Sequence, residues 1–247
     1  MDTKSQSIGD RMKWNYELPY TFRLANRLPK ILRIDGRCFH SVSRKLNWKK
    51  PYDERAIMSF GVLAREMCKE IMNVKLAYLQ SDEISFLIID YDKIETQPWF
   101  GNELQKICSI AAGIASAKFS LRWNIEAVFD ARIFIVPPEE VCNYFIWRQH
   151  DATRNSIQGY AQIMFSQREI SNLNTIQLMD KMYKEKNFNW DELNPIYKRG
   201  TCALKDNKDI RDHWYIDTNI PTFSQDRKYI EDYIPGLSIN RQEKEYP

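Results

Sequence analysis

The feature that most constrains the fold is a pair of short apolar segments separated by only four polar residues. The segments are Leu76 to Leu79 and Ile84 to Ile89, and each is typical of a β-strand in length and composition. The residues between them, Gln80-Ser81-Asp82-Glu83, suit a tight turn. The pattern predicts a β-hairpin that carries two adjacent carboxylates, Asp82 and Glu83, at its tip.

Helical and strand-like patterns alternate along the rest of the chain. From Asp53 to Met72, apolar residues recur at spacings of three and four, which is typical of an amphipathic helix. Strands are expected at residues 31–34, 131–136 and 199–204, and further helices at 104–121, from 139 onward, at 172–184 and at 191–197. We expect one domain spanning residues 1–247, an α/β (α+β) fold with a core at about 12–204 and a helical extension at about 205–247.

Composition limits the cellular setting and the cofactors. Five cysteines are scattered without a Cys-x-x-Cys pair and there are only 3 histidines, so a structural zinc site is not expected. The longest uncharged apolar stretch, Ile107 to Ala117, is about half the length of a membrane span. The sequence contains neither a G-x-G-x-x-G segment nor a Walker A loop. We expect a cytoplasmic protein with reduced thiols and no membrane partner.

Two polar groups are candidates for contact with nucleic acid, which the net charge of +3 permits without requiring. The first is a basic cluster made up of Arg44, Lys45, Lys49 and Lys50, with Trp48 among them. The second is a series on the helix expected after residue 139, made up of Arg148, Gln149, Asp151 and Asn155. Each group is either a solvated face or a surface that binds RNA.

The carboxylates have a possible chemical role besides turn formation. Asp35 ends the strand at residues 31–34, and antiparallel pairing would bring it to the same sheet edge as Asp82 and Glu83. Three carboxylates in a small volume stay ionised only beside a cation. Oxygen ligands suit Mg²⁺, and two such ions could assist phosphoryl transfer. Asp-Gly and Ser-Asp-Glu are also ordinary turn sequences, so the spacing alone leaves both interpretations open.

Six segments in order resemble the motifs of one family. Ile34 to His40 resembles its metal- and nucleotide-binding segment, and Gln80 to Phe86 resembles its second carboxylate motif. The other four segments are Lys49 to Ala56, Phe129 to Arg132, Trp147 to Asp151 and Tyr197 to Thr201. On these segments, over about residues 12–204, the chain resembles the tRNA-His guanylyltransferase superfamily of 3′-to-5′ polymerases.

The resemblance implies a palm-like antiparallel sheet flanked by helices, and two Mg²⁺ ions held by Asp35, the Gly36 carbonyl and Asp82. It implies a catalytic set of Asp35, Asp82 and Glu83. ATP or GTP would bind at residues of the two nucleotide sites, which are Arg37, Cys38, Phe39, His40, Ser81, Glu83 and Lys106. Family members act on tRNA and are typically homotetramers built as dimers of dimers. The candidate tRNA contacts are then Lys49, Lys50, Arg148, Gln149 and Asn155.

One segment departs from the family pattern. Eukaryotic guanylyltransferases carry His-Ile-Asn-Asn shortly after the Trp-Arg-Gln segment, whereas this chain has Thr153-Arg154-Asn155-Ser156. The departure favours the guanylyltransferase-like branch, which repairs 5′-truncated tRNA by template-directed addition. We therefore expect a template-dependent 3′-to-5′ nucleotidyltransferase. The competing hypotheses are G addition to tRNA-His, a tRNA-binding module without catalysis, and a nucleotide cyclase or 5′-to-3′ polymerase that shares the fold.

Overall fold

A six-stranded antiparallel sheet forms the centre of the computed structural model, which describes residues 7–206 and 213–237. The strand order is β4-β1-β3-β2-β5-β6, and every neighbouring pair is antiparallel. The strands are β1 (Lys30–Gly36), β2 (Val74–Gln80), β3 (Glu83–Ile88), β4 (Phe129–Ile135), β5 (Thr201–Lys205) and β6 (Trp214–Asp217). The antiparallel sheet expected from the sequence is confirmed.

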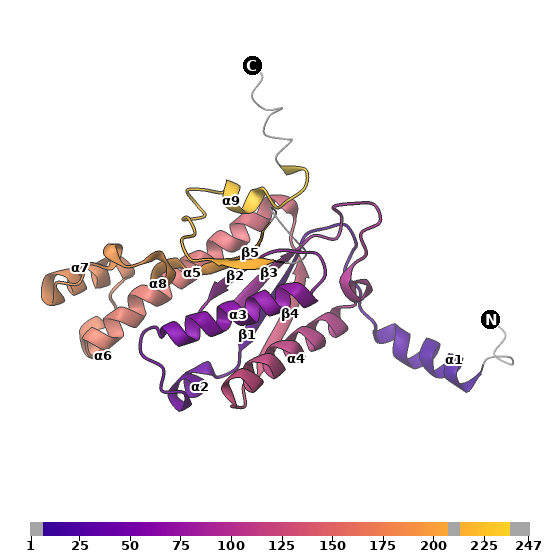
Figure 1. Ribbon diagram of the computed structural model, residues 1–247, viewed down its shortest axis with the longest axis horizontal. Coiled ribbons are helices and arrows are strands. Elements are labelled where there is room, and N and C mark those ends of the chain that lie inside the picture. The colour runs from indigo at the N-terminus through magenta and orange to yellow at the C-terminus, as the bar shows by residue number, and fades with distance from the viewer. Residues whose placement is uncertain (1–6, 207–212, 238–247) are drawn as a thin grey trace, which may run out of the picture.

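Helices cover both faces of this sheet (Figure 1). α3 (Glu54–Glu70) and α4 (Leu104–Trp123) pack on one face, and α5 (Pro138–Met164) lies against the other. The other helical segments are α1 (Ile8–Met12), η1 (Lys13–Glu17), η2 (Leu18–Tyr20), α2 (Phe39–Lys45), η3 (Trp99–Asn102), α6 (Gln167–Ile170), α7 (Thr175–Lys186), η4 (Trp190–Glu192), α8 (Pro195–Arg199) and α9 (Lys228–Glu231). The mixed fold class is confirmed. No helix within the described ranges has the length and apolar character that crossing a membrane requires.

Side chains along β1 point alternately to the two faces of the sheet, and each face carries its own layer of hydrophobic core. Leu32 and Ile34 belong to the layer beneath α3 and α4, whereas Ile31 belongs to the layer beneath α5. Helix α4 approaches the sheet closely because the residues it buries there include two small ones, Ala111 and Ala115. The same alternation leaves Arg33 and Asp35 on the α5 side of β1, where the charged groups of the site gather.

The predicted hairpin is present and its turn is short. Gln80 and Glu83 are the paired residues nearest the turn, so only Ser81 and Asp82 connect β2 to β3. Ser81 has a φ of 51°, in the left-handed region that serine adopts rarely. The turn places Asp82 at the end of the sheet where β1 also ends.

The C-terminal part differs from the sequence-based expectation. Residues 191–197 form the separate segments η4 and α8 because Pro195 starts a helix well but cannot continue one. The extension contains a strand besides a helix, since β6 pairs with β5 and α9 follows. Its residues 207–212 and 238–247, like residues 1–6 of the N-terminal segment, lie outside the described residues.

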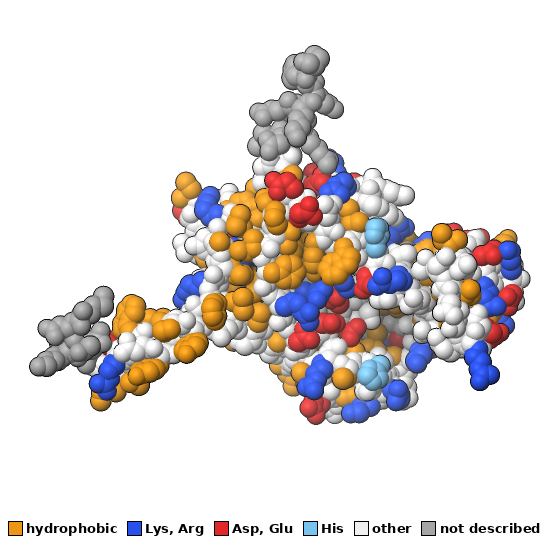
Figure 2. Space-filling model, turned by 180° about the vertical axis from the view of Figure 1, so that it is seen from behind, with side chains coloured by type: hydrophobic (Ala, Val, Ile, Leu, Met, Phe, Trp, Pro, Cys, Tyr) orange, Lys and Arg blue, Asp and Glu red, His pale blue; other side chains and the backbone are white. Residues whose placement is uncertain are grey.

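The N-terminal segment, residues 7–22, projects from the body of the molecule (Figure 1). None of the residues in α1, η1 or η2 is buried. Figure 2 shows apolar side chains along this segment, and those exposed to solvent are Ile8, Met12, Trp14, Tyr16, Tyr20 and Phe22. A segment of this kind offers apolar surface that the rest of the described chain does not cover.

Candidate active site

The site is built where β1 ends beside the turn of the hairpin. Asp35 pairs with Glu83 of β3 on one side and with Asp130 of β4 on the other. The Gly36 amide donates a hydrogen bond to the Asp82 carbonyl over 3.2 Å. The antiparallel register therefore brings Asp35, Asp82 and Glu83 to one edge of the sheet, as the sequence predicts.

Gly36 is needed because an aromatic ring approaches its Cα. A Cβ atom there would overlap the ring of Phe39. Phe39 is implied by the resemblance as a nucleotide contact, yet its side chain is buried beneath the site and packs on Phe60, Phe119 and Phe129. Its neighbours Arg37, Cys38 and His40 are exposed.

Asp35 and Asp82 are two partly buried carboxyl groups that repel each other. Burial, followed by the charge of Asp35, raises the pKa of Asp82 to about 6. The pKa of Asp35 is raised as well, by burial first and then by the charges of Glu83 and Asp130. A cation between them would compensate these charges, and carboxylate and carbonyl oxygens are the ligands that Mg²⁺ prefers. The donor set of the site therefore suits a divalent cation.

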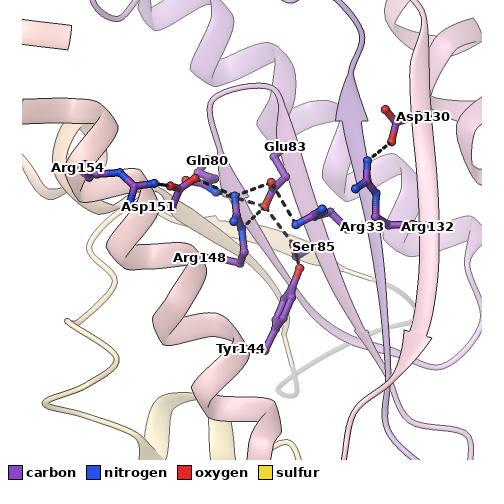
Figure 3. Close-up of polar contacts among 10 residues, drawn as sticks. All are labelled: Arg33, Gln80, Glu83, Ser85, Asp130, Arg132, Tyr144, Arg148, Asp151 and Arg154. Atoms are coloured by element: carbon purple, nitrogen blue, oxygen red, sulfur yellow. Dashed lines mark hydrogen bonds and ion pairs between the residues drawn. The ribbon is translucent and has the colours of Figure 1, made fainter. Parts of the chain in front are cut away.

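Glu83 forms an ion pair with an arginine of α5, the helix that covers one face of the sheet. Arg148 of α5 donates from Nε to Glu83 Oε1 over 2.8 Å and from Nη2 to Oε2 over 2.7 Å (Figure 3). The Arg33 Nη1 atom lies 3.9 Å from the same carboxylate. Within the described part of the chain, no three His, Cys, Asp or Glu side chains are grouped so as to hold a metal ion. The carboxylates that remain for a cation are Asp35 and Asp82.

A cleft of about 1160 Å³ opens beside Asp82. One wall is formed by α2 and the segment that leads into α3, and the other by α5, α8 and the residues between α5 and α6. Small-molecule sites usually enclose roughly 300–1,000 Å³, so this cleft has room for a nucleotide and for more besides. The predicted site residues that line it are Phe39, His40, Lys49, Lys50, Ser81, Asp82 and Asn155.

Two residues predicted to contact tRNA are internal instead. Gln149 is only 2% exposed; its side-chain nitrogen donates to the Pro221 carbonyl over 2.9 Å, and its oxygen accepts from the Phe223 amide over 2.8 Å. Arg148 is 7% exposed and is committed to Glu83. Neither side chain is available to RNA, contrary to the prediction, because this part of α5 faces the sheet and the C-terminal segment.

Lys106 is separated from the other predicted nucleotide contacts. It lies near the start of α4, with its Nζ 5.2 Å from the centre of the Phe100 ring. The site adjoins the far end of the same helix, where Phe119 packs on Phe39. Lys106 precedes Phe119 by 13 residues, which is about 20 Å along an α-helix. Within one chain, Lys106 and Ser81 therefore do not share a site.

Charged residues on β1 and β4 beside Asp35 belong to the site although they were not among the predicted site residues. Asp130 Oδ1 accepts a hydrogen bond from Arg132 Nη2 over 2.9 Å, and Arg132 pairs in register with Arg33 (Figure 3). The buried Nε of Arg33 has no hydrogen-bond partner among the described residues. The spacing of Asp130 and Arg132 could have predicted this ion pair, since residues two apart in a strand point to the same face.

Comparison with known proteins identifies the fold family. A bacterial tRNA(His) guanylyltransferase-like protein in complex with ATP shares 42% sequence identity and superposes with a TM-score of 0.86, over 93% of this chain and 100% of that one. A corresponding bacterial structure in complex with GTP shares 42% identity with a TM-score of 0.82. A crystal structure of tRNA(His) guanylyltransferase from Saccharomyces cerevisiae is 18% identical over 87% of this chain, has a TM-score of 0.68 and shares the fold.

Sequence comparison agrees. The family model described as tRNAHis guanylyltransferase matches residues 9–137. The tRNA(His) guanylyltransferase of Debaryomyces hansenii is 28% identical over 78% of this chain and 76% of its own length. The probable human enzyme is 26% identical over 70% of this chain, and the match spans 63% of that protein. The fold and these relatives thus make the protein a nucleotidyltransferase. More narrowly, the chain belongs to the tRNAHis guanylyltransferase family.

Proposed function

We propose that this protein extends the 5′ end of 5′-truncated tRNA in the 3′-to-5′ direction, with the opposing base as template. The observation that carries the proposal is that Asp82, whose charge interacts with that of Asp35, lines a cleft of about 1160 Å³, which has room for a nucleotide and the end of an RNA. The two bacterial relatives, described in complex with ATP and with GTP and 42% identical over 93% of this chain, support it.

The reaction consists of two phosphoryl transfers. The 5′-monophosphate of the tRNA first displaces pyrophosphate from ATP (or GTP); a 5′ end that already carries a triphosphate needs no such step. The 3′-hydroxyl of the incoming nucleotide then attacks the activated phosphate and releases the nucleoside monophosphate or pyrophosphate. Neither step needs a protein nucleophile, because positioning and charge stabilisation suffice. His40 and Ser81 line the cleft beside Asp82, where the nucleotide binds.

Two Mg²⁺ ions fit the donor set of this site. Asp35, Asp82 and the Gly36 carbonyl would hold them, and the carboxyl pKa values raised by burial and mutual repulsion support a cation there. When bound, the ions neutralise charge on the transferred phosphate. The chain itself keeps these oxygens together at one sheet edge through the hydrogen bond from Gly36 to Asp82.

The departure of α5 from the guanylyltransferase pattern, at residues 153–156, favours repair over G addition. Ser156 of the Thr153-Arg154-Asn155-Ser156 segment is buried and donates to the Tyr197 carbonyl over 2.6 Å. Of the four residues, only Asn155 lines the cleft. The identity is 42% to guanylyltransferase-like proteins but 28% and 26% to named guanylyltransferases, which points the same way. The names of the curated relatives favour the second candidate function, G addition at position −1 of tRNA-His.

The same proposal includes the partners of the protein. The exposed Lys49 and Lys50, at the cleft, contact the tRNA backbone together with Asn155. The chain forms a homotetramer, a dimer of dimers, and the exposed apolar side chains of the projecting residues 7–22 support contacts between subunits (Figure 2). The protein acts in the cytoplasm, where cysteines that form no disulfide stay reduced.

The decisive assay uses a 5′-monophosphorylated tRNA that lacks its first nucleotide, with ATP, all four NTPs and Mg²⁺. Each of the four template bases is placed opposite the gap in turn, and product length is measured. We expect the added nucleotide to follow the opposing base. Addition of G irrespective of the template would establish the tRNA-His activity instead.

The Asp35→Ala variant distinguishes an enzyme from a tRNA-binding module. It should abolish addition while tRNA binding persists, since the carboxylate serves the reaction and not the RNA. If Asp35→Ala retained full extension, the metal assignment would be wrong; if wild type bound tRNA without extending any substrate, the protein would be a binding module. Product formed by wild type from nucleotides without RNA would identify a cyclase.

A further inference from the structure

Glu83 occupies a position from which it could become a third metal ligand. It follows Asp82 directly in the sequence and lies opposite Asp35 in the register of β1 and β3. Its side chain nevertheless makes a two-point ion pair with Arg148, over 2.8 and 2.7 Å (Figure 3). Both carboxylate oxygens of Glu83 are therefore directed at α5.

Arg148 is held in place from its own helix. Its Nη2 atom also donates to Asp151 Oδ2 over 3.0 Å, and Asp151 is in turn paired with the exposed Arg154. The next residue, Gln149, ties α5 to the Pro221 carbonyl and the Phe223 amide. The guanidinium is thus fixed by contacts on both sides before any substrate arrives.

Among the described residues, no other charged group pairs with Glu83 as closely as Arg148 does. Arg33 approaches Glu83 only to 3.9 Å, through one nitrogen. The remaining polar contacts of the carboxylate are with neutral groups, Gln80 Nε2 at 3.2 Å and Ser85 Oγ at 3.5 Å. Without Arg148, the Glu83 charge would be left beside Asp35 and Asp82 with little to compensate it.

We propose that Arg148 is a positioning residue that withholds Glu83 from the metal site, so that the cation is bound through two carboxylates and not three. The inference rests on the metal site of the proposed function. A third carboxylate would tighten cation binding, because affinity rises with the charge of the ligand set. It would also occupy coordination positions that Mg²⁺ in phosphoryl transfer keeps for water and substrate phosphates. Arg148 thereby leaves room on the metal for the nucleotide.

The test measures Mn²⁺ binding by electron paramagnetic resonance, with Mg²⁺ as competitor and no nucleotide present. Arg148→Met should bind Mn²⁺ about tenfold more tightly than wild type, while its turnover number falls and its KM for NTP rises. Arg148→Lys, which keeps the charge but makes one contact, should lie between the two. Arg154→Met is the matched control, since Arg154 touches Asp151 but not Glu83, and its Mn²⁺ affinity should be that of wild type.

The double variant Glu83→Gln/Arg148→Met decides the matter even if the single variant does not fold. It removes the pair as a unit and should bind Mn²⁺ within about twofold of wild type, because Glu83 is not a ligand there. A loss of about tenfold in the double variant would make Glu83 a ligand and overturn the inference. So would unchanged or weaker binding in a folded Arg148→Met.

Failure of the proposed function is distinguishable from failure of this inference. If no tRNA is extended but Arg148→Met tightens Mn²⁺ binding as expected, the substrate assignment falls and the role of Arg148 stands. If tRNA is extended and the Mn²⁺ affinities do not respond, the function stands and the role of Arg148 falls.

Discussion

Replacing one carboxylate of the metal pair should make the protein more stable and inactive at the same time. Asp82→Asn exchanges an ionised group for a neutral amide of the same shape. The amide removes the repulsion with Asp35 and the cost of burying a charge, which together raise the pKa of Asp82 to about 6. The Asp82 charge serves the reaction but destabilises the folded state, so its removal should favour folding.

The size of the effect follows from the pKa of Asp82. A value of about 6 in place of the ordinary 3.8 corresponds to about 3 kcal/mol once the group is ionised. Asp82 is partly exposed, so solvent screens the charge and we expect about 1–2 kcal/mol. Between these two pKa values the folded state holds its proton and the unfolded chain has lost it. Stability therefore falls as pH rises through this interval, and the advantage of Asp82→Asn is present at pH 7 and absent below about pH 4.

Urea denaturation in EDTA at about pH 4 and pH 7.5 measures this difference. Asp180→Asn, on the exposed surface of α7, is the matched control and should change stability by less than about 0.5 kcal/mol. Added Mg²⁺ should stabilise wild type but not Asp82→Asn, since only wild type retains the ligand. A loss of stability in Asp82→Asn at pH 7.5, or a gain of equal size at both pH values, would refute the reasoning.

Three further predictions concern other parts of the chain. Lys30→Met should destabilise the protein by about 3–5 kcal/mol in urea denaturation, because it leaves Asp90 charged and buried after the loss of a 2.8 Å ion pair; the double change with Asp90→Leu should cost less than the single one. Gln149→Ala should lower the free energy of unfolding by about 1–3 kcal/mol, because two internal hydrogen bonds are lost. The tRNA affinity should not change at a temperature where the variant is folded. A loss of tRNA binding in the folded variant would show that Gln149 contacts RNA after all. Lys49→Ala with Lys50→Ala should weaken tRNA binding and reduce the salt dependence of log K by roughly 1 for each lysine in a filter-binding titration, whereas an unchanged slope would place the RNA elsewhere.

The local elements around the site could be located from the sequence alone. Strand β1, the hairpin, α3 and α4 each carry a pattern complete within the element, either an apolar period or a turn sequence. Strand β6 carries no such pattern, and its 4 residues become a strand by pairing with β5. Short elements stabilised mainly by their neighbours are therefore not visible in the local sequence pattern.

The sequence by itself predicted that Asp35, Asp82 and Glu83 meet at one sheet edge, because each carboxylate stands where an apolar strand ends and antiparallel pairing brings such ends together, and the register confirms it. Tertiary structure alone decided what each polar side chain does there. Arg148 contacts Glu83 across 65 positions of the chain, and Gln149 contacts Phe223 across 74. Hydrogen bonds and ion pairs act over a few ångströms, so the packing of α5 on the sheet turned two residues that resembled a solvated face into internal supports of the site.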